Sequence, residues 1–156
     1  MRRRKGFSLI ELIVVIVIMS IIGLMTFTFF GNSLAAYLTI KNTNRIFDEG
    51  LLALERMTRE IRDADTVNFP ITAVSNTSIT FTRKHATPQD ASTSITFRRT
   101  GNLLERVGNI SGTRVLAGNV TSFSPTIVGR NVNLSLGLSL SGGGTIALQS
   151  SAAARN

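Results

Sequence analysis

A continuous apolar run near the N-terminus restricts this chain more than any other feature. Between Phe7 and Phe30 the sequence holds 24 residues and a single charged one, Glu11. As a helix the run would be about 36 Å long, enough to cross a hydrocarbon layer about 30 Å thick. The sequence therefore predicts a membrane-spanning helix over residues 7–30.

Four basic residues, at positions 2 to 5, come directly before this run. By the positive-inside rule they keep the N-terminus in the cytoplasm, so the remainder of the chain lies outside it. A cleavable secretory signal would have a shorter apolar region that ends in a small-residue site, and no such site ends this run. We expect a single-pass protein of the cytoplasmic (inner) membrane, for which a plain signal anchor is the simplest interpretation.

Two residues suggest more than an anchor. Glu11 is a carboxylate at membrane depth, which costs a few kcal/mol and usually marks a partnered, functional group. The run contains no basic residue to pair with it. Cutting the chain between Gly6 and Phe7 would free an amine one helical turn from Glu11. That amine, of the same or a neighbouring chain, would supply the missing cation.

Residues 4–12 read Arg-Lys-Gly-Phe-Ser-Leu-Ile-Glu-Leu before the apolar helix. This segment resembles the class III leader of type IV prepilins. The resemblance implies that a prepilin peptidase cuts after Gly6 and N-methylates Phe7. It also implies that Glu11 neutralises the N-terminus of an adjacent subunit during filament assembly. More weakly, residues 50–64 and the last five residues are similar to W-type minor pilins and to J-type pseudopilins of type II secretion.

Beyond the membrane the helix is expected to continue to about Asp65, since no proline occurs before Pro70. Its apolar positions form one stripe that we expect to cover a sheet. The opposite face offers oppositely charged pairs at i,i+4, typical of a solvated surface. The stripe consists of Ile40, Phe47, Leu51, Leu54 and Ile61; the pairs are Glu55/Arg59, Arg56/Glu60 and Arg59/Asp63.

After Thr66 the apolar period changes from 3.6 to 2, which is typical of half-buried strands. Alternation predicts strands over residues 78–84, 94–100, 103–107, 114–117, 132–140 and 145–149, and the glycines 142–144 predict a hairpin turn. The predicted fold is α+β and pilin-like, with a long N-terminal helix packed on an antiparallel β-sheet head. The expected parts are a leader (1–6), a membrane or filament-core half of the helix (7–30), an amphipathic half (31–65) and the head (66–156).

Composition argues against catalysis. The chain has no cysteine and one histidine, His85, which excludes thiol chemistry and multi-histidine metal sites. We expect no enzyme activity, metal or cofactor, and a solvated His85. Residues 66–156 nevertheless carry a net charge of +6, from eight basic and two acidic residues.

Four of these basic residues, Arg83, Lys84, Arg98 and Arg99, end two strands that we expect to be neighbours. Such a patch could contact phosphates of DNA or an acidic neighbouring subunit. A solvated or subunit-facing patch is favoured over DNA. We therefore expect a structural, minor subunit of a type IV pilus or a type II secretion pseudopilus, with other subunits and the prepilin peptidase as partners. The alternative is a DNA-uptake or adhesive subunit that binds an anionic ligand through its head.

Overall fold

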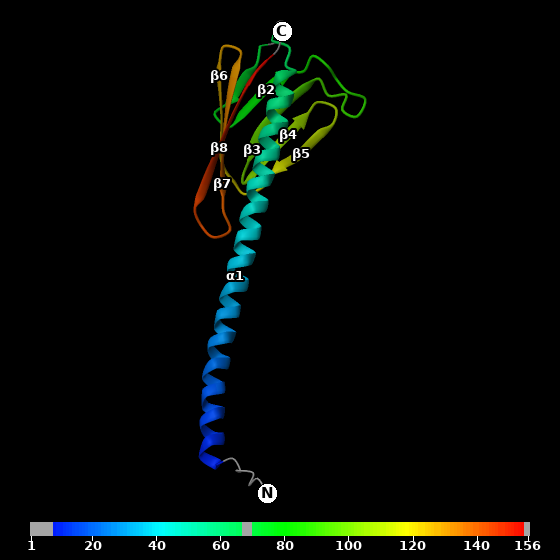
Figure 1. Ribbon diagram of the computed structural model, residues 1–156. Coiled ribbons are helices and arrows are strands. Elements are labelled where there is room, and N and C mark those ends of the chain that lie inside the picture. The colour runs from blue at the N-terminus through cyan, green and yellow to red at the C-terminus, as the bar shows by residue number, and fades with distance from the viewer. Residues whose placement is uncertain (1–7, 67–69, 155–156) are drawn as a thin grey trace. The chain divides into compact units, whose positions relative to one another are not determined.

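The computed structural model describes residues 8–66 and 70–154 (Figure 1). One helix is followed by eight strands, and the chain divides into two units, Met1–Ile40 and Lys41–Asn156. The helix, α1, covers Leu9–Arg62 and contributes to both units. The strands are β1 (Thr72–Ser75), β2 (Ser78–Thr82), β3 (Ser94–Thr100), β4 (Leu103–Gly108), β5 (Gly112–Ala117), β6 (Val120–Val128), β7 (Asn131–Ser139) and β8 (Thr145–Ala153).

Helix α1 is continuous through Gly31, Asn32 and Ser33, which are poor helix formers. It ends three residues before the predicted Asp65, in a turn where the N–H of Ala64 bonds the carbonyl of Ile61. Its apolar part also contains hydroxyl side chains. Those of Ser20 and Thr26 donate to the carbonyls four residues earlier, at 2.7 and 2.8 Å. These polar groups are therefore satisfied within the helix and need no water.

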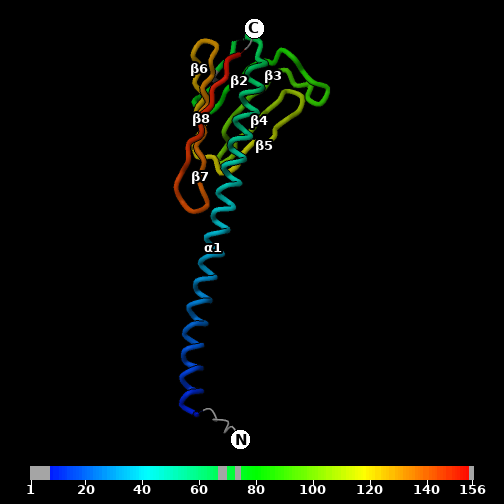
Figure 2. The backbone as a smooth tube through the Cα atoms, in the orientation of Figure 1, coloured from blue at the N-terminus to red at the C-terminus, as the bar shows by residue number. Residues whose placement is uncertain are grey.

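The first five strands form one antiparallel sheet in the order β1-β2-β3-β4-β5. This meander runs from green to yellow in Figure 2. The chain turns between β3 and β4 at Gly101, which has a φ of 61°. Phe81 and Phe97 point into the core, and their ring centroids lie 5.7 Å apart.

The last three strands form a second antiparallel sheet, β6-β7-β8, where the sequence had suggested only one sheet. Strand β6 was not predicted from the sequence. A register shift between Val120 and Ser122 interrupts its alternation, and it contains Pro125, which lacks an N–H and is tolerated only on an edge strand. The glycine hairpin is confirmed, because Gly143 and Gly144 adopt positive φ between β7 and β8.

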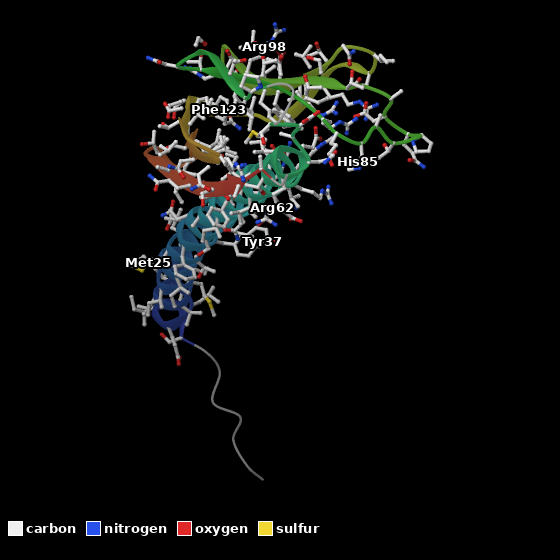
Figure 3. The ribbon with its side chains drawn as sticks, turned by 90° about the horizontal axis from the view of Figure 1, so that it is seen from above. Met25, Tyr37, Arg62, His85, Arg98 and Phe123 are labelled. Carbon is white, nitrogen blue, oxygen red and sulfur yellow. The ribbon has the colours of Figure 1, made fainter. Side chains whose placement is uncertain are left out.

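The core lies between the C-terminal part of α1 and the two sheets, whose strands form separate layers in Figure 3. Antiparallel strands packed with a helix confirm the α+β class. The largest buried apolar side chains of the core include Phe81, Phe97, Phe123, Met57 and Ile61, together with Ile79, Ile95, Leu104, Leu134, Leu136 and Leu138.

The predicted helix stripe was partly wrong. Leu54 and Ile61 are buried, but Ile40 is 61% and Leu51 43% exposed. The buried face also includes Gly50 and Ala53, small residues that a stripe of large apolar side chains leaves out. A Cβ added at Gly50 would come within 2.5 Å of Leu138 Cδ1, so this glycine allows close approach of helix and sheet.

Candidate functional site: the N-terminal helix and a buried charge network

The first part of α1 exposes its apolar side chains. None of residues 8–40 is buried, and Phe27 is 80% exposed. The helix is long and apolar enough to cross a membrane. Exposed large apolar residues would be costly in water, at about 25 cal/mol per Å². This segment therefore requires lipid or another protein around it.

Glu11 lies in the first turn of α1. The N–H groups of Glu11 and Leu12 both bond the carbonyl of Ser8, at 3.0 and 3.2 Å. A negative charge is favourable there because the helix dipole is positive at its N-terminal end. Within residues 8–66 and 70–154, no cation pairs with the Glu11 carboxylate. Gly6 and Phe7, the predicted cleavage and methylation sites, lie outside the described residues.

A second cluster of charged residues lies in the head and was not predicted. Arg106, on β4, is completely buried. Its Nε donates to both carboxylate oxygens of Glu60 on α1, at 3.0 and 2.9 Å, and its Nη1 donates to Ser111 Oγ at 3.0 Å. Its Nη2 donates to Asp90 Oδ2. Arg106 therefore joins the helix, the β2–β3 loop and the β4–β5 turn.

Asp90 receives further donors. Arg83 Nη2 lies 3.5 Å from Asp90 Oδ2, and the N–H of Ser92 donates to Oδ1 at 3.1 Å. Burial alone would raise the pKa of Asp90. The Ser92 hydrogen bonds and the charges of Arg106 and Arg83 outweigh that effect and lower the pKa to about 2. Asp90 is therefore ionised at neutral pH.

Glu60 also accepts from Arg56 Nε at 3.0 Å, so the predicted Arg56/Glu60 pair forms. The expectation that this helix face is simply solvated was wrong at Glu60, which is 11% exposed. The other two pairs do not appear within the described residues. Asp63 instead lies 2.7 Å from the Nδ1 of His85, and Arg59 has no ion pair there.

His85 is 74% exposed, so the prediction of a solvated histidine is confirmed. Its ring nevertheless contacts the carboxylate of Asp63, which lies 22 residues away in the sequence. In the view of Figure 3, His85 lies beyond α1 on the side away from the orange and red strands.

The four basic residues predicted as a patch have different environments. Arg83 is 9% exposed and donates to the carbonyls of Asp90 and Ser92. Arg98 Nε pairs with Glu105 at 3.0 Å, and the Thr100 hydroxyl and Arg98 together lower the pKa of Glu105. Arg99 Nε donates to the carbonyl of Val120 at 3.3 Å, whereas Lys84 is exposed. Binding of DNA by this set stays the less favoured alternative to a solvated or subunit-facing patch.

Comparison with known proteins bears on the N-terminal segment. Residues 1–27 match the family model for the prokaryotic N-terminal methylation motif. The segment is a type IV prepilin-like class III leader. No curated protein and no solved structure matches the chain. The motif thus supports a type IV pilin-like protein, and with the long apolar helix it supports membrane anchoring.

The acids and the histidine of the head do not gather as metal ligands where the structure describes them. Among the described residues, no group of three or more His, Cys, Asp or Glu side chains could hold a metal ion. Every buried side-chain nitrogen or oxygen described has a hydrogen-bond partner. The buried atoms of the charge network are therefore satisfied internally, as expected for a structural tie between α1 and the sheet.

One signal in the sequence could have revealed this network. Strand β4 alternates with Leu104, Arg106 and Gly108 on the buried side. An arginine at an inward position must find buried acceptors. Asp90 and Glu105 are the only acids after residue 65. Glu60, the main acceptor, is 46 residues away and could not be paired with Arg106 by local pattern.

Proposed function

We propose that this protein is a structural subunit of a type IV pilus or of a type II secretion pseudopilus. The observation that carries the proposal is the methylation motif at residues 1–27. It is joined to a helix whose residues 8–40 expose apolar side chains along their whole length. These apolar side chains lie outside the chain's own core, so the helix is suited to assembly with other subunits.

The proposed maturation begins in the cytoplasmic membrane, with the N-terminus in the cytoplasm and the head outside it. A prepilin peptidase removes residues 1–6 by cutting between Gly6 and Phe7, and then N-methylates Phe7. The four basic residues before Gly6 and the uncharged segment after Glu11 support this orientation.

The proposed role of Glu11 follows from its isolation. Its carboxylate occupies the first turn of an apolar helix and has no cationic partner among the described residues. The amine freed at Phe7 of a neighbouring subunit would neutralise it. Such a pair is far more favourable in an apolar surrounding than either charge alone.

Within this function we propose a minor subunit, which starts or caps the filament. The likeness of residues 50–64 and of the chain end to W-type minor pilins and J-type pseudopilins supports that assignment. The partners are other pilin or pseudopilin subunits. The role is structural, in keeping with the motif, whose family is structural rather than catalytic.

The test compares Glu11→Gln with Glu49→Gln in cells that assemble the filament. Both changes remove one carboxylate from α1, but Glu49 pairs with Arg45 at 2.9 Å in the head unit. We expect both variants to be cleaved, and only Glu11→Gln to be lost from the sheared filament fraction. Normal incorporation of Glu11→Gln would contradict the assembly role. Failure of cleavage in the unchanged chain would contradict the function itself.

A further inference from the structure

A polar hollow of about 470 Å³ lies on the head beside the end of α1. Helix α1 contributes one wall, and the segment after β2 contributes the other. Its lining combines several arginines with several acids: Arg56, Arg59, Glu60, Asp63, Arg83, His85, Thr87 and Asp90. The completely buried Arg106 binds two of these acids from beneath, which fixes their positions.

Each acid in the hollow already has its cation or donors. Glu60 is shared by Arg106 and Arg56. Asp90 is shared by Arg106 and Arg83. Asp63 accepts from the backbone N–H of His85 at 3.2 Å and contacts its ring Nδ1. No carboxylate that lines the hollow therefore lacks a cationic partner or donor.

The cations, in contrast, are in excess. Four guanidinium groups, those of Arg56, Arg59, Arg83 and Arg106, face three carboxylates. Arg59 is the one left over, because it forms no ion pair within the described residues, even though Glu55 and Asp63 stand one helical turn away on either side. Arg56 uses only its Nε on Glu60, so its two terminal nitrogens are also available.

We propose that this hollow binds one carboxylate group, supplied by an acidic side chain of a partner polypeptide, with Arg59 and Arg56 as its donors. One carboxylate balances the single excess charge. A planar guanidinium binds a carboxylate through two parallel hydrogen bonds. A polyanion such as DNA would bring more negative charge than the single excess cation of the hollow can balance.

A polypeptide is the better source than a free acid. An ion pair at an exposed site contributes only about 0–1 kcal/mol, so a free small carboxylate would bind weakly. A carboxylate on a protein that already binds the head elsewhere is held near the hollow at a high effective concentration, so even a weak ion pair can form. If the proposed function holds, a neighbouring subunit is such a protein, but the hollow itself does not depend on assembly.

The test is an NMR titration of the full-length chain in detergent micelles, which follows the arginine side-chain Nε–H signals. The probes are the blocked peptide Gly-Glu-Gly, its Gly-Gln-Gly counterpart, sodium acetate and inorganic phosphate. We expect saturable shifts at Arg59 and Arg56 with Gly-Glu-Gly and none with Gly-Gln-Gly. Arg59→Gln should weaken this binding about fivefold. Arg114→Gln, which changes an exposed arginine on β5, should leave it unchanged.

The remaining outcomes also decide the matter. Acetate should shift the same two signals, because it carries the same group as Gly-Glu-Gly and neither probe docks elsewhere on the head; an acetate that shifts neither arginine would overturn the carboxylate as the group bound. Phosphate that binds more tightly than Gly-Glu-Gly would overturn the carboxylate as ligand. Absence of saturable shifts, or equal weakening by Arg114→Gln, would overturn the site. Because no step needs a filament, such a failure leaves the proposed function untouched.

Discussion

The two parts of helix α1 share a continuous backbone but differ in the charge and the burial of their side chains. Residues 9–40 include one charge, Glu11, and none of them is buried. Residues 41–62 carry many charges, yet Ile46, Leu54, Met57 and Ile61 are nearly or fully buried against the sheets. The more apolar part of the helix is thus the exposed part, and the part with more charged residues is the one that contributes to the core. The first part must be covered by something outside the chain, whereas the second part is stabilised by the chain's own core.

The largest loss of unfolding free energy is expected on removing the charge that ties the second part of α1 to the sheet. Arg106→Ala leaves Glu60 and Asp90 without their buried cation and should cost about 5 kcal/mol of unfolding free energy. Urea denaturation of the micelle-bound chain, followed by circular dichroism, measures this loss. Arg114→Ala is the matched control, since Arg114 lies directly opposite Arg106 on β5 and is exposed. Equal losses would mean that the network does not hold helix and sheet together.

A phenylalanine can be removed from the first part of α1 and, for comparison, from the sheet against which the second part packs. Phe97→Ala empties a fully buried position beside Phe81 and should cost about 4 kcal/mol. Phe27→Ala removes a ring that is 80% exposed in the first part and should leave the unfolding free energy of the head unchanged. The same denaturation measurement separates them. A comparable loss for Phe27→Ala would show that the first part is packed within the single chain.

Acid should weaken the attachment of the second part of α1 to the sheet through Asp90, which shares Arg106 with Glu60. The pKa of Asp90 is lowered from 3.8 to about 2 in the folded chain, so the ionised group stabilises the fold above pH 3.8. That stabilisation is lost as the pH falls from about 4 to about 2. Asp90→Asn should cost about 2 kcal/mol at neutral pH, because it removes charged hydrogen bonds. It should also reduce the acid dependence in this window, as denaturation at several pH values would show. Unchanged acid dependence would contradict this role of Asp90.

Replacing one glycine in each part of α1 by alanine is expected to give the smallest effects, and these should differ in sign. Gly31 has no neighbouring atom within 4 Å of an added Cβ, so Gly31→Ala should stabilise the helix by about 1 kcal/mol. At Gly50 the same change meets Leu138 and Leu148, and overpacking should outweigh the helix gain and leave a net loss of about 1 kcal/mol. Hydrogen exchange around each glycine measures the sign. Stabilisation at both positions would show that Leu138 moves aside freely.

Much of the fold could be predicted from the sequence because periodicity is a local property. The apolar run predicted α1, and strict alternation at Val132, Leu134, Leu136 and Leu138 predicted β7. Strand β6 was missed because a register shift and Pro125 interrupt its alternation. The helix face was misplaced by about one residue, since Gly50 and Ala53 contact the sheet without being large.

The candidate site divides in the same way. The leader and Glu11 could be recognised because their signal lies within a dozen consecutive residues. The Arg106–Glu60–Asp90 network could not, since it joins residues from the helix, a strand and a loop that are distant in sequence. Arg59 has no ion pair within residues 8–66 and 70–154, and Asp63 instead contacts His85 across 22 residues, which only the three-dimensional structure reveals.

The most direct test of the account is the intact mass and N-terminal residue of the membrane-extracted chain, prepared with and without an active prepilin peptidase. The account predicts a chain that begins at N-methylated Phe7 when the peptidase is present and at Met1 when it is absent. A chain that still begins at Met1 beside an active peptidase would contradict the proposed maturation and leave a membrane-anchored protein with a basic head.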